Sequence, residues 1–170
     1  ILAQKSACGT LSENSFCVVS IVSSRLARCI CGRYGVKLYE TPTGSKYIAE
    51  LINTLDDNGS ERFVMGFEEG NGYLIGTDVR EKDAIAAAML IAEMAAAAKA
   101  SGRRLYEELI AMYALYGYAA EKSFSITRDG VAGRAAIAEC MSHYRGMDGA
   151  LGDGEDELSG LDITKYTDFS

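Results

Sequence analysis

The chain has 170 residues, of which 48% are hydrophobic and 24% are charged. This is enough for one domain with a hydrophobic core, and it is too apolar for a disordered chain. The net charge of −7 argues against a nucleic-acid-binding protein that works through a basic surface. The hydrophobic segment 84–98 contains Glu93 and is too short to span a bilayer, so we expect no contact with a membrane.

Acidic residues are concentrated at the C-terminus. Residues 148–170 contain seven acidic residues and one lysine, Lys165, and so carry −6 of the −7 net charge. This Gly-rich stretch predicts a solvated linker or tail, because Asp153–Glu157 lacks the alternating pattern of a calcium-binding loop. The chain begins with Ile1 and not with Met, which suggests a processed chain or a piece of a longer one.

The cysteines and the single histidine do not form a recognisable site. The spacing of the five cysteines fits neither a zinc site nor a CxxC redox pair, so we expect small hydrophobic side chains in a reducing compartment. His143 has no second histidine near it in the sequence, and we do not expect it to be catalytic.

Strand-type apolar runs predict three strands, over residues 16–22, 36–41 and 62–67. The run at 16–22 is continuous, which is typical of a strand buried on both faces of a parallel sheet. A short apolar piece follows at 73–75, and the weak alternation at 123–127 predicts an edge strand.

Helical periodicity predicts a helix after each of the first two strands and further helices later in the chain. The first is capped by Ser23 or Ser24 and closed by Gly35, and the others cover residues 45–55, 83–100, 103–116 and 134–144. The helix at 83–100 is apolar almost all round, so we expect it to be covered on most sides. The order β-α-β-α-β-α-α-β-α predicts an α/β fold with a mostly parallel sheet of about four strands.

Two loops are predicted at the carboxyl ends of strands, where open α/β sheets bind ligands. Thr41–Lys46 offers hydroxyls and free helix N–H groups to an anion or a sugar, or it is an ordinary helix cap. Gly66–Leu74 places the carboxylates of Glu68 and Glu69 among three glycines, which suits a polyhydroxylated ligand. A mobile surface turn is the alternative. No helix follows the glycines directly, which disfavours a dinucleotide site.

The segment Asp78–Asp83 mixes charges directly before the long predicted helix. Arg80 and Lys82 lie where positive charge and the helix dipole can hold a phosphate. A solvated charge cluster explains the same pattern.

Taken in order, these segments resemble the third domain of the α-D-phosphohexomutases, the phosphoglucomutase/phosphomannomutase superfamily. The matching segments are Ile21–Arg25, Glu40–Lys46, Gly66–Leu74, Val79–Asp83, Leu105–Leu109 and Tyr113–Gly117. The resemblance implies a three-layer α/β/α domain III over residues 15–147. It also implies an inter-domain lead-in over 1–14 and a linker over 148–170 toward a missing fourth domain.

The resemblance implies that the full-length protein interconverts hexose 1-phosphate and hexose 6-phosphate. The family does so through a phosphoserine enzyme and a hexose 1,6-bisphosphate intermediate, with Mg²⁺ and glucose 1,6-bisphosphate as cofactors. Its third domain recognises the sugar. The expected partners are the hexose phosphate and the other three domains, with no nucleic acid and no membrane, in the cytoplasm.

Carried over onto this sequence, the substrate-binding residues are Thr43, Gly44, Glu68, Gly70 and Lys82, with possible support from Lys46, Glu69 and Arg80. Glu68 would bind ring hydroxyls, and Lys82 would reach a substrate oxygen or phosphate. Two positions depart from the family pattern. Gly70 replaces the expected serine and so removes one hydroxyl contact, and Ser45 replaces a bulky residue.

The sequence contains no Ser-His-Asn phosphoserine loop, no Asp-x-Asp-x-Asp metal loop and no Arg-rich phosphate loop with a Ser-Gly-Thr core. The resemblance assigns these to the other domains, so we expect no catalytic residue and no bound metal in this piece, which should be inactive alone. Two alternatives remain open. One is a non-catalytic sugar-phosphate-binding or regulatory module of the same fold, suggested by Gly70, and the other is a nucleotide-binding regulator.

Overall fold

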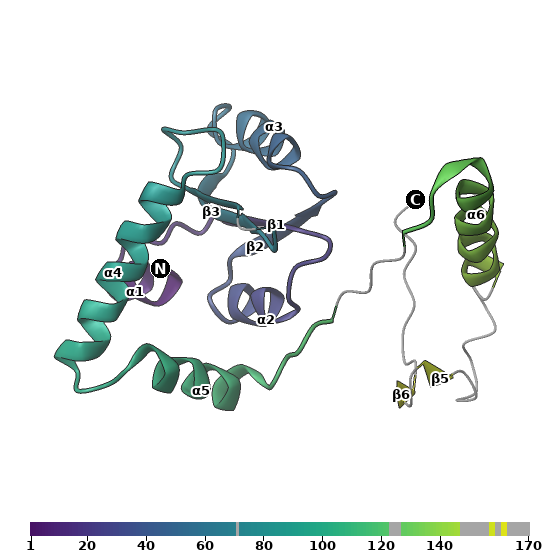
Figure 1. Ribbon diagram of the computed structural model, residues 1–170. Helices are drawn as coiled ribbons and strands as arrows, with labels where there is room; N and C mark the ends of the chain where they lie inside the picture. The colour runs from purple at the N-terminus through teal and green to yellow at the C-terminus, as the bar shows by residue number, and fades with distance from the viewer. Residues whose placement is uncertain (71, 123–126, 147–156, 159–160, 163–170) are drawn as a thin grey trace. The chain divides into compact units, whose positions relative to one another are not determined.

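The computed structural model describes residues 1–70, 72–122, 127–146, 157–158 and 161–162. It divides into two units, Ile1–Glu121 and Lys122–Ser170 (Figure 1). The second unit contains helix α6 (Gly130–Gly146) and an antiparallel pair of two-residue strands, β5 (Glu157–Leu158) and β6 (Leu161–Asp162). The first unit contains all the remaining elements.

A four-stranded sheet forms the centre of the first unit, in the order β2-β1-β3-β4. Its strands are β1 (Ser15–Ser20), β2 (Lys37–Thr41), β3 (Arg62–Glu68) and β4 (Gly72–Ile75). β2 and β3 both pair parallel with β1, and β4 pairs antiparallel with β3. All six residues of β1 are buried, as expected for a central strand covered on both faces. The prediction of an α/β fold with a mostly parallel sheet of about four strands is confirmed.

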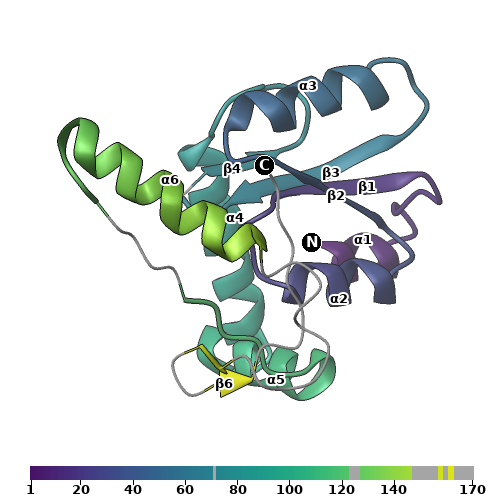
Figure 2. The same cartoon turned by 90° about the vertical axis from the view of Figure 1, so that its right-hand side faces the viewer.

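Helices cover both faces of this sheet and give the three layers (Figures 1 and 2). α3 (Ser45–Leu55) lies on one face, and α1 (Leu2–Ala7) and α2 (Leu26–Arg33) lie on the other. α4 (Ala84–Ala100) contacts β4, and α5 (Leu105–Tyr116) contacts both α4 and α2.

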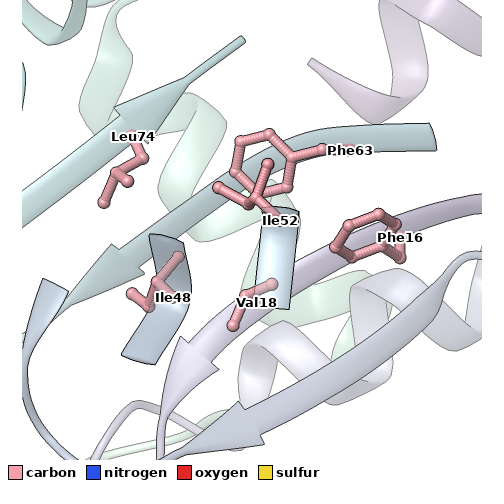
Figure 3. Packing of buried hydrophobic residues seen from close by; sticks show 6 residues of the cluster. All are labelled: Phe16, Val18, Ile48, Ile52, Phe63 and Leu74. Carbon is pink, nitrogen blue, oxygen red and sulfur yellow. The ribbon is translucent and has the colours of Figure 1, made fainter. Parts of the chain in front are cut away.

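The hydrophobic core consists of one cluster on each face of the sheet. The cluster under α3 is shown in Figure 3 and comprises Phe16, Val18, Ile48, Ile52, Phe63 and Leu74. The cluster on the α1 and α2 face comprises Leu2, Cys17, Cys31, Val36 and Val64. Successive residues of β1 alternate between the two clusters, because side chains of a strand point to opposite faces. The core therefore fixes both helical layers on the same central strand.

Two of the three capping signals in the sequence are confirmed, whereas the N-cap of α2 is Arg25 and not Ser23 or Ser24. Asp83 Oδ1 accepts hydrogen bonds from the N–H groups of Ile85 at 3.0 Å and Ala86 at 2.9 Å, so Asp83 caps α4. Gly35 follows α2 with φ +65°, and Val36 N–H donates to the carbonyl of Cys31 at 3.0 Å. This is the Schellman arrangement that a glycine in this position favours.

Several element boundaries differ from the predicted ones. β1 ends at Ser20 and not at residue 22, because the N–H of Ser23 donates to the carbonyl of Ser20 and turns the chain. The fourth strand of the sheet is β4, formed by the short apolar piece, whereas residues 123–126 of the predicted edge strand lie outside the described residues. α1 was not predicted, and α6 begins at Gly130 instead of residue 134. The acidic stretch 148–156 also lies outside the described residues.

Helix α4 is less covered than its sequence predicts. Of its residues only Ala87 and Ala98 are buried, while Ile85 is 77% exposed and Met89 is 62% exposed. Within the described residues, no single helix has both the length and the apolar composition needed to cross a membrane. α4 and α5 together have them, but the pair is bent by 88° at the break between them.

Replacing a core residue under α3 should destabilise the first unit. Ile52 is fully buried, so Ile52→Ala should lower the free energy of unfolding by about 2–5 kcal/mol through lost burial and the cavity left behind. Ile85→Ala, on the exposed side of α4, should change it by less than about 0.5 kcal/mol. Urea unfolding of both variants measures this difference, and equal effects would contradict the core described above.

The cysteines of the first unit should differ sharply in reactivity. Cys17 and Cys31 are buried, whereas Cys8 and Cys29 are exposed. A hydrogen bond with Cys17, together with burial, raises the pKa of the Cys31 thiol, which disfavours the reactive thiolate. A disulfide reagent added to the native protein should therefore modify Cys8 and Cys29 quickly, and Cys17 and Cys31 only at the rate of unfolding. Mass spectrometry of the labelled peptides identifies the order, and rapid labelling of Cys31 would refute it.

Candidate functional site

The carboxyl ends of the strands bring polar positions together in one row. Ser20 of β1 pairs in register with Thr41 of β2, and Glu68 at the end of β3 pairs with Gly72 of β4. Ser20 follows Val18 by two residues and so lies on the same face of the sheet, the face covered by α3. This row lies at the edge of the sheet where open α/β folds bind ligands.

Glu68 is the charged residue at the centre of this row. Its side chain is 2% exposed. One carboxylate oxygen, Oε1, accepts a hydrogen bond from the backbone N–H of Gly44, and the other, Oε2, lies 3.2 Å from the ammonium of Lys82. A buried carboxylate needs such partners, because desolvation without them is costly. Gly44 also precedes the first turn of α3, where the helix dipole favours negative charge.

The loop before α3 depends on a glycine conformation. Gly44 has φ +137°, a region that residues with a side chain rarely adopt. This conformation turns the N–H of Gly44 toward Glu68. Thr43 is exposed next to it, while the ammonium of Lys46 lies 4.7 Å from the centre of the Tyr47 ring. The structure therefore joins Gly44 to Glu68 and directs Lys46 to an aromatic ring.

The neighbouring loop before α4 contributes Glu81 and Lys82. The side chain of Ser45 and the backbone N–H of Lys82 hydrogen-bond to the carboxylate of Glu81, and these bonds lower its pKa. The loop thus meets the start of α3 at Ser45, and Lys82 in the same loop lies beside Glu68. Sequence reasoning treated Arg80 and Lys82 as a pair, but Arg80 turns to Asp57, after the end of α3, at 2.5 Å.

The remaining predicted residues lie in the loop after β3. Glu69 accepts a hydrogen bond from the N–H of Ser24 at 3.2 Å and so links this loop to the one after β1. Gly70 is exposed, and a Cβ built on it would meet nothing within 4 Å. A side chain at position 70 has room, and the glycine there contributes no hydroxyl to the site.

The structure adds one residue that sequence reasoning missed. Ser20 is 1% exposed, and its hydroxyl lies 3.1 Å from that of Ser23. Beside it in the row, Thr41 is also buried, with no hydrogen-bond partner for its hydroxyl among the described residues. The signal in the sequence is a serine that interrupts the continuous apolar run, but the predicted strand extends two residues past it.

Two other features of the described residues do not compete with this site. Within the described ranges, no group of three or more His, Cys, Asp or Glu side chains is placed to hold a metal ion. A cavity of about 360 Å³ lies among Ser6, Leu11, Ser12, Glu13, Tyr34 and Gly35. These residues precede β1 and β2, at the opposite edge of the sheet from Glu68.

The three-layer α/β/α arrangement belongs to the class of open α/β domains, which generally bind ligands at the carboxyl edge of the sheet. The family model for phosphoglucomutase/phosphomannomutase, alpha/beta/alpha domain III, matches residues 1–113. The chain belongs to this family, as the sequence resemblance indicated.

Individual relatives agree with this assignment. A phosphoglucomutase of Staphylococcus aureus (strain MSSA476) is 34% identical over 152 residues, which is 89% of this chain and 26% of that protein. A phosphoglucomutase of Staphylococcus epidermidis (strain RP62A) is 35% identical over 150 residues, 88% of this chain and 26% of that protein. The chain thus spans about a quarter of the length of these relatives.

A solved structure gives the same result for the fold. The crystal structure assigned as a phosphomannomutase from Thermus thermophilus superposes with a TM-score of 0.54 at 26% identity. The match covers 68% of this chain and 24% of that one.

Gly44→Ala should test the conformation that joins the two loops. An alanine at φ +137° is strained, so the variant should lose about 1–3 kcal/mol of stability. Gly70→Ala is the matched control, because its Cβ meets nothing, and it should stay within about 0.5 kcal/mol of wild type. Urea unfolding of the 170-residue chain compares the two, and a Gly44→Ala variant as stable as Gly70→Ala would contradict the geometry.

Proposed function

We propose that this chain is the sugar-recognition domain of a phosphoglucomutase/phosphomannomutase, an isomerase that interconverts hexose 1-phosphate and hexose 6-phosphate. The observation that carries the proposal is the buried Glu68 carboxylate, held by Gly44 and Lys82 at the carboxyl edge of the sheet. Family membership supports the reaction class, since the named relatives are phosphoglucomutases.

In this proposal Glu68 orients the sugar ring. An ionised carboxylate offers about four acceptor positions, of which the Gly44 N–H and the Lys82 ammonium use two. The remaining two would accept hydrogen bonds from two neighbouring ring hydroxyls, which requires the Glu68 side chain, 2% exposed here, to open to the substrate. Such charge-assisted bonds are strong and directional, so they select the position of the hydroxyls and thereby the sugar.

Lys82 would complete the site on its outer side. Its side chain is 42% exposed, so the ammonium can stay paired with the Glu68 carboxylate and still contact an oxygen of the phosphate or the ring. Thr43, exposed beside Gly44, adds a hydroxyl at the same edge. Gly70 contributes only its backbone, and the absent hydroxyl removes a contact of about 0.5–1.5 kcal/mol.

The phosphoryl transfer itself belongs to the rest of the protein in this proposal. The phosphoserine, the magnesium ion and the phosphate-binding arginines lie outside this chain, and glucose 1,6-bisphosphate acts there. The chain alone recognises the hexose phosphate and does not catalyse the transfer. The other three domains are therefore its necessary partners.

A mutase assay on the full-length protein tests the proposal. Glucose 1-phosphate and mannose 1-phosphate would be supplied in turn, with magnesium and the 1,6-bisphosphate. Glu68→Gln keeps the size of the side chain but removes the charge, so it should lower kcat/KM at least about tenfold. Activity on one or both sugars, with this loss, is the expected result.

Glu61→Gln is the matched control. Glu61 is also a buried glutamate paired with a lysine, Lys37, but it precedes β3 at the opposite edge of the sheet. It should leave kcat/KM within about twofold of wild type, because it touches no part of the proposed site. An active protein indifferent to Glu68→Gln would refute the site, and a protein inactive on both sugars would favour the non-catalytic module.

A further inference from the structure

Gly72 occupies a position in which a side chain would require the Lys82 side chain to move. A Cβ built on Gly72 would lie 2.7 Å from Cε of Lys82, 3.0 Å from its Cδ and 3.1 Å from Oε2 of Glu68. Real Cβ atoms essentially never approach another atom as closely as 2.7 Å. The lysine stem therefore fills the space that the missing side chain leaves on the face of β4.

Gly72 stands where a strand begins and another side chain comes close. It is the first residue of β4 and pairs in register with Glu68 of β3. Glycine in a strand often marks a close approach of another group. Here the approaching group is the side chain of Lys82, which occupies the space that a side chain at position 72 would take.

The path of Lys82 over Gly72 is fixed by the chain on either side. The N–H of Asp83 donates to the carbonyl of Tyr73 at 2.8 Å, which anchors the start of α4 to β4. Lys82 thus begins beside Tyr73, and its side chain crosses Gly72 to reach Glu68. The pair Gly72 and Glu68 is also in register across β3 and β4, so the crossing is direct.

We propose that Gly72 is a positioning residue of the recognition site: by leaving its face of β4 empty, it allows the Lys82 side chain to lie across the strand and hold Glu68. The consequence for hexose phosphate binding rests on the function proposed above. A methyl group at position 72 displaces Lys82 and leaves the buried carboxylate with the Gly44 N–H alone.

A double-mutant cycle separates this role from a general effect on folding. The variants are Gly72→Ala, Lys82→Ala and the double variant, with Gly32→Ala as a control glycine whose Cβ meets nothing in α2. Each is measured in two ways: by thermal unfolding of the 170-residue chain, and by KM and kcat for hexose 1-phosphate in the full-length protein. The unfolding arm requires no activity.

Both single variants should lower the melting temperature by about 2–4 °C and raise KM about tenfold, with a smaller change in kcat. The double variant should come close to Lys82→Ala in both, since without the lysine stem the extra methyl group meets only Oε2 of Glu68, at 3.1 Å. Even if Gly72→Ala folds poorly, the double variant should fold as well as Lys82→Ala.

The inference is overturned if Gly72→Ala is silent, or if its effects on melting temperature add in full to those of Lys82→Ala. Coupling in unfolding without any mutase activity in the wild-type protein would refute the proposed function but leave the positioning role intact. Mutase activity in the wild-type protein, with no coupling between positions 72 and 82 in unfolding, would refute the positioning role but leave the proposed function intact.

Discussion

The structure of the first unit depends on the burial of strand β1 on both of its faces and along both of its edges. All six of its residues are buried, so each must match a neighbour on the correct side. Phe16 and Val18 pack against α3, while Cys17 packs against the layer formed by α1 and α2. Because β2 and β3 run parallel to β1, the loops that follow these three strands all begin at the same edge of the sheet. The position of the site is thus a consequence of how the central strand is covered.

The polar site and the hydrophobic core cannot be separated, because α3 belongs to both. Ile48 and Ile52 hold α3 against the sheet, and this contact fixes the start of the helix where Gly44 meets Glu68. Ile48 also lies so close to Gly66 that a Cβ there would be 3.0 Å from its methyl group. A carboxylate without partners would be costly at this site because it is buried. The residues that bury it are the same ones that cover the sheet.

Helices with a sustained hydrophobic pattern and a clear end could be predicted from the sequence. Examples are α3 and also α4, whose cap is Asp83. The end of β1 could not, because Ile21 continues the apolar run while a turn of Ser20 and Ser23 stops the strand. β4 is only four residues long, too short for a pattern. The family resemblance singled out Glu68, Gly44 and Lys82, but not that they contact one another. Arg80 and Lys82 have the same charge and lie two residues apart, and only the fold directs one to Asp57 and the other to Glu68.

The loop after β3 has a rigid base and a free tip, and this division bears on how such a domain diverges. Glu68 at the base is enclosed, so a change there disturbs several neighbours at once. Gly70 at the tip faces open space, so almost any small side chain can be introduced without moving the base. Single substitutions at the tip can therefore change the side chain that the loop presents, while the scaffold stays the same.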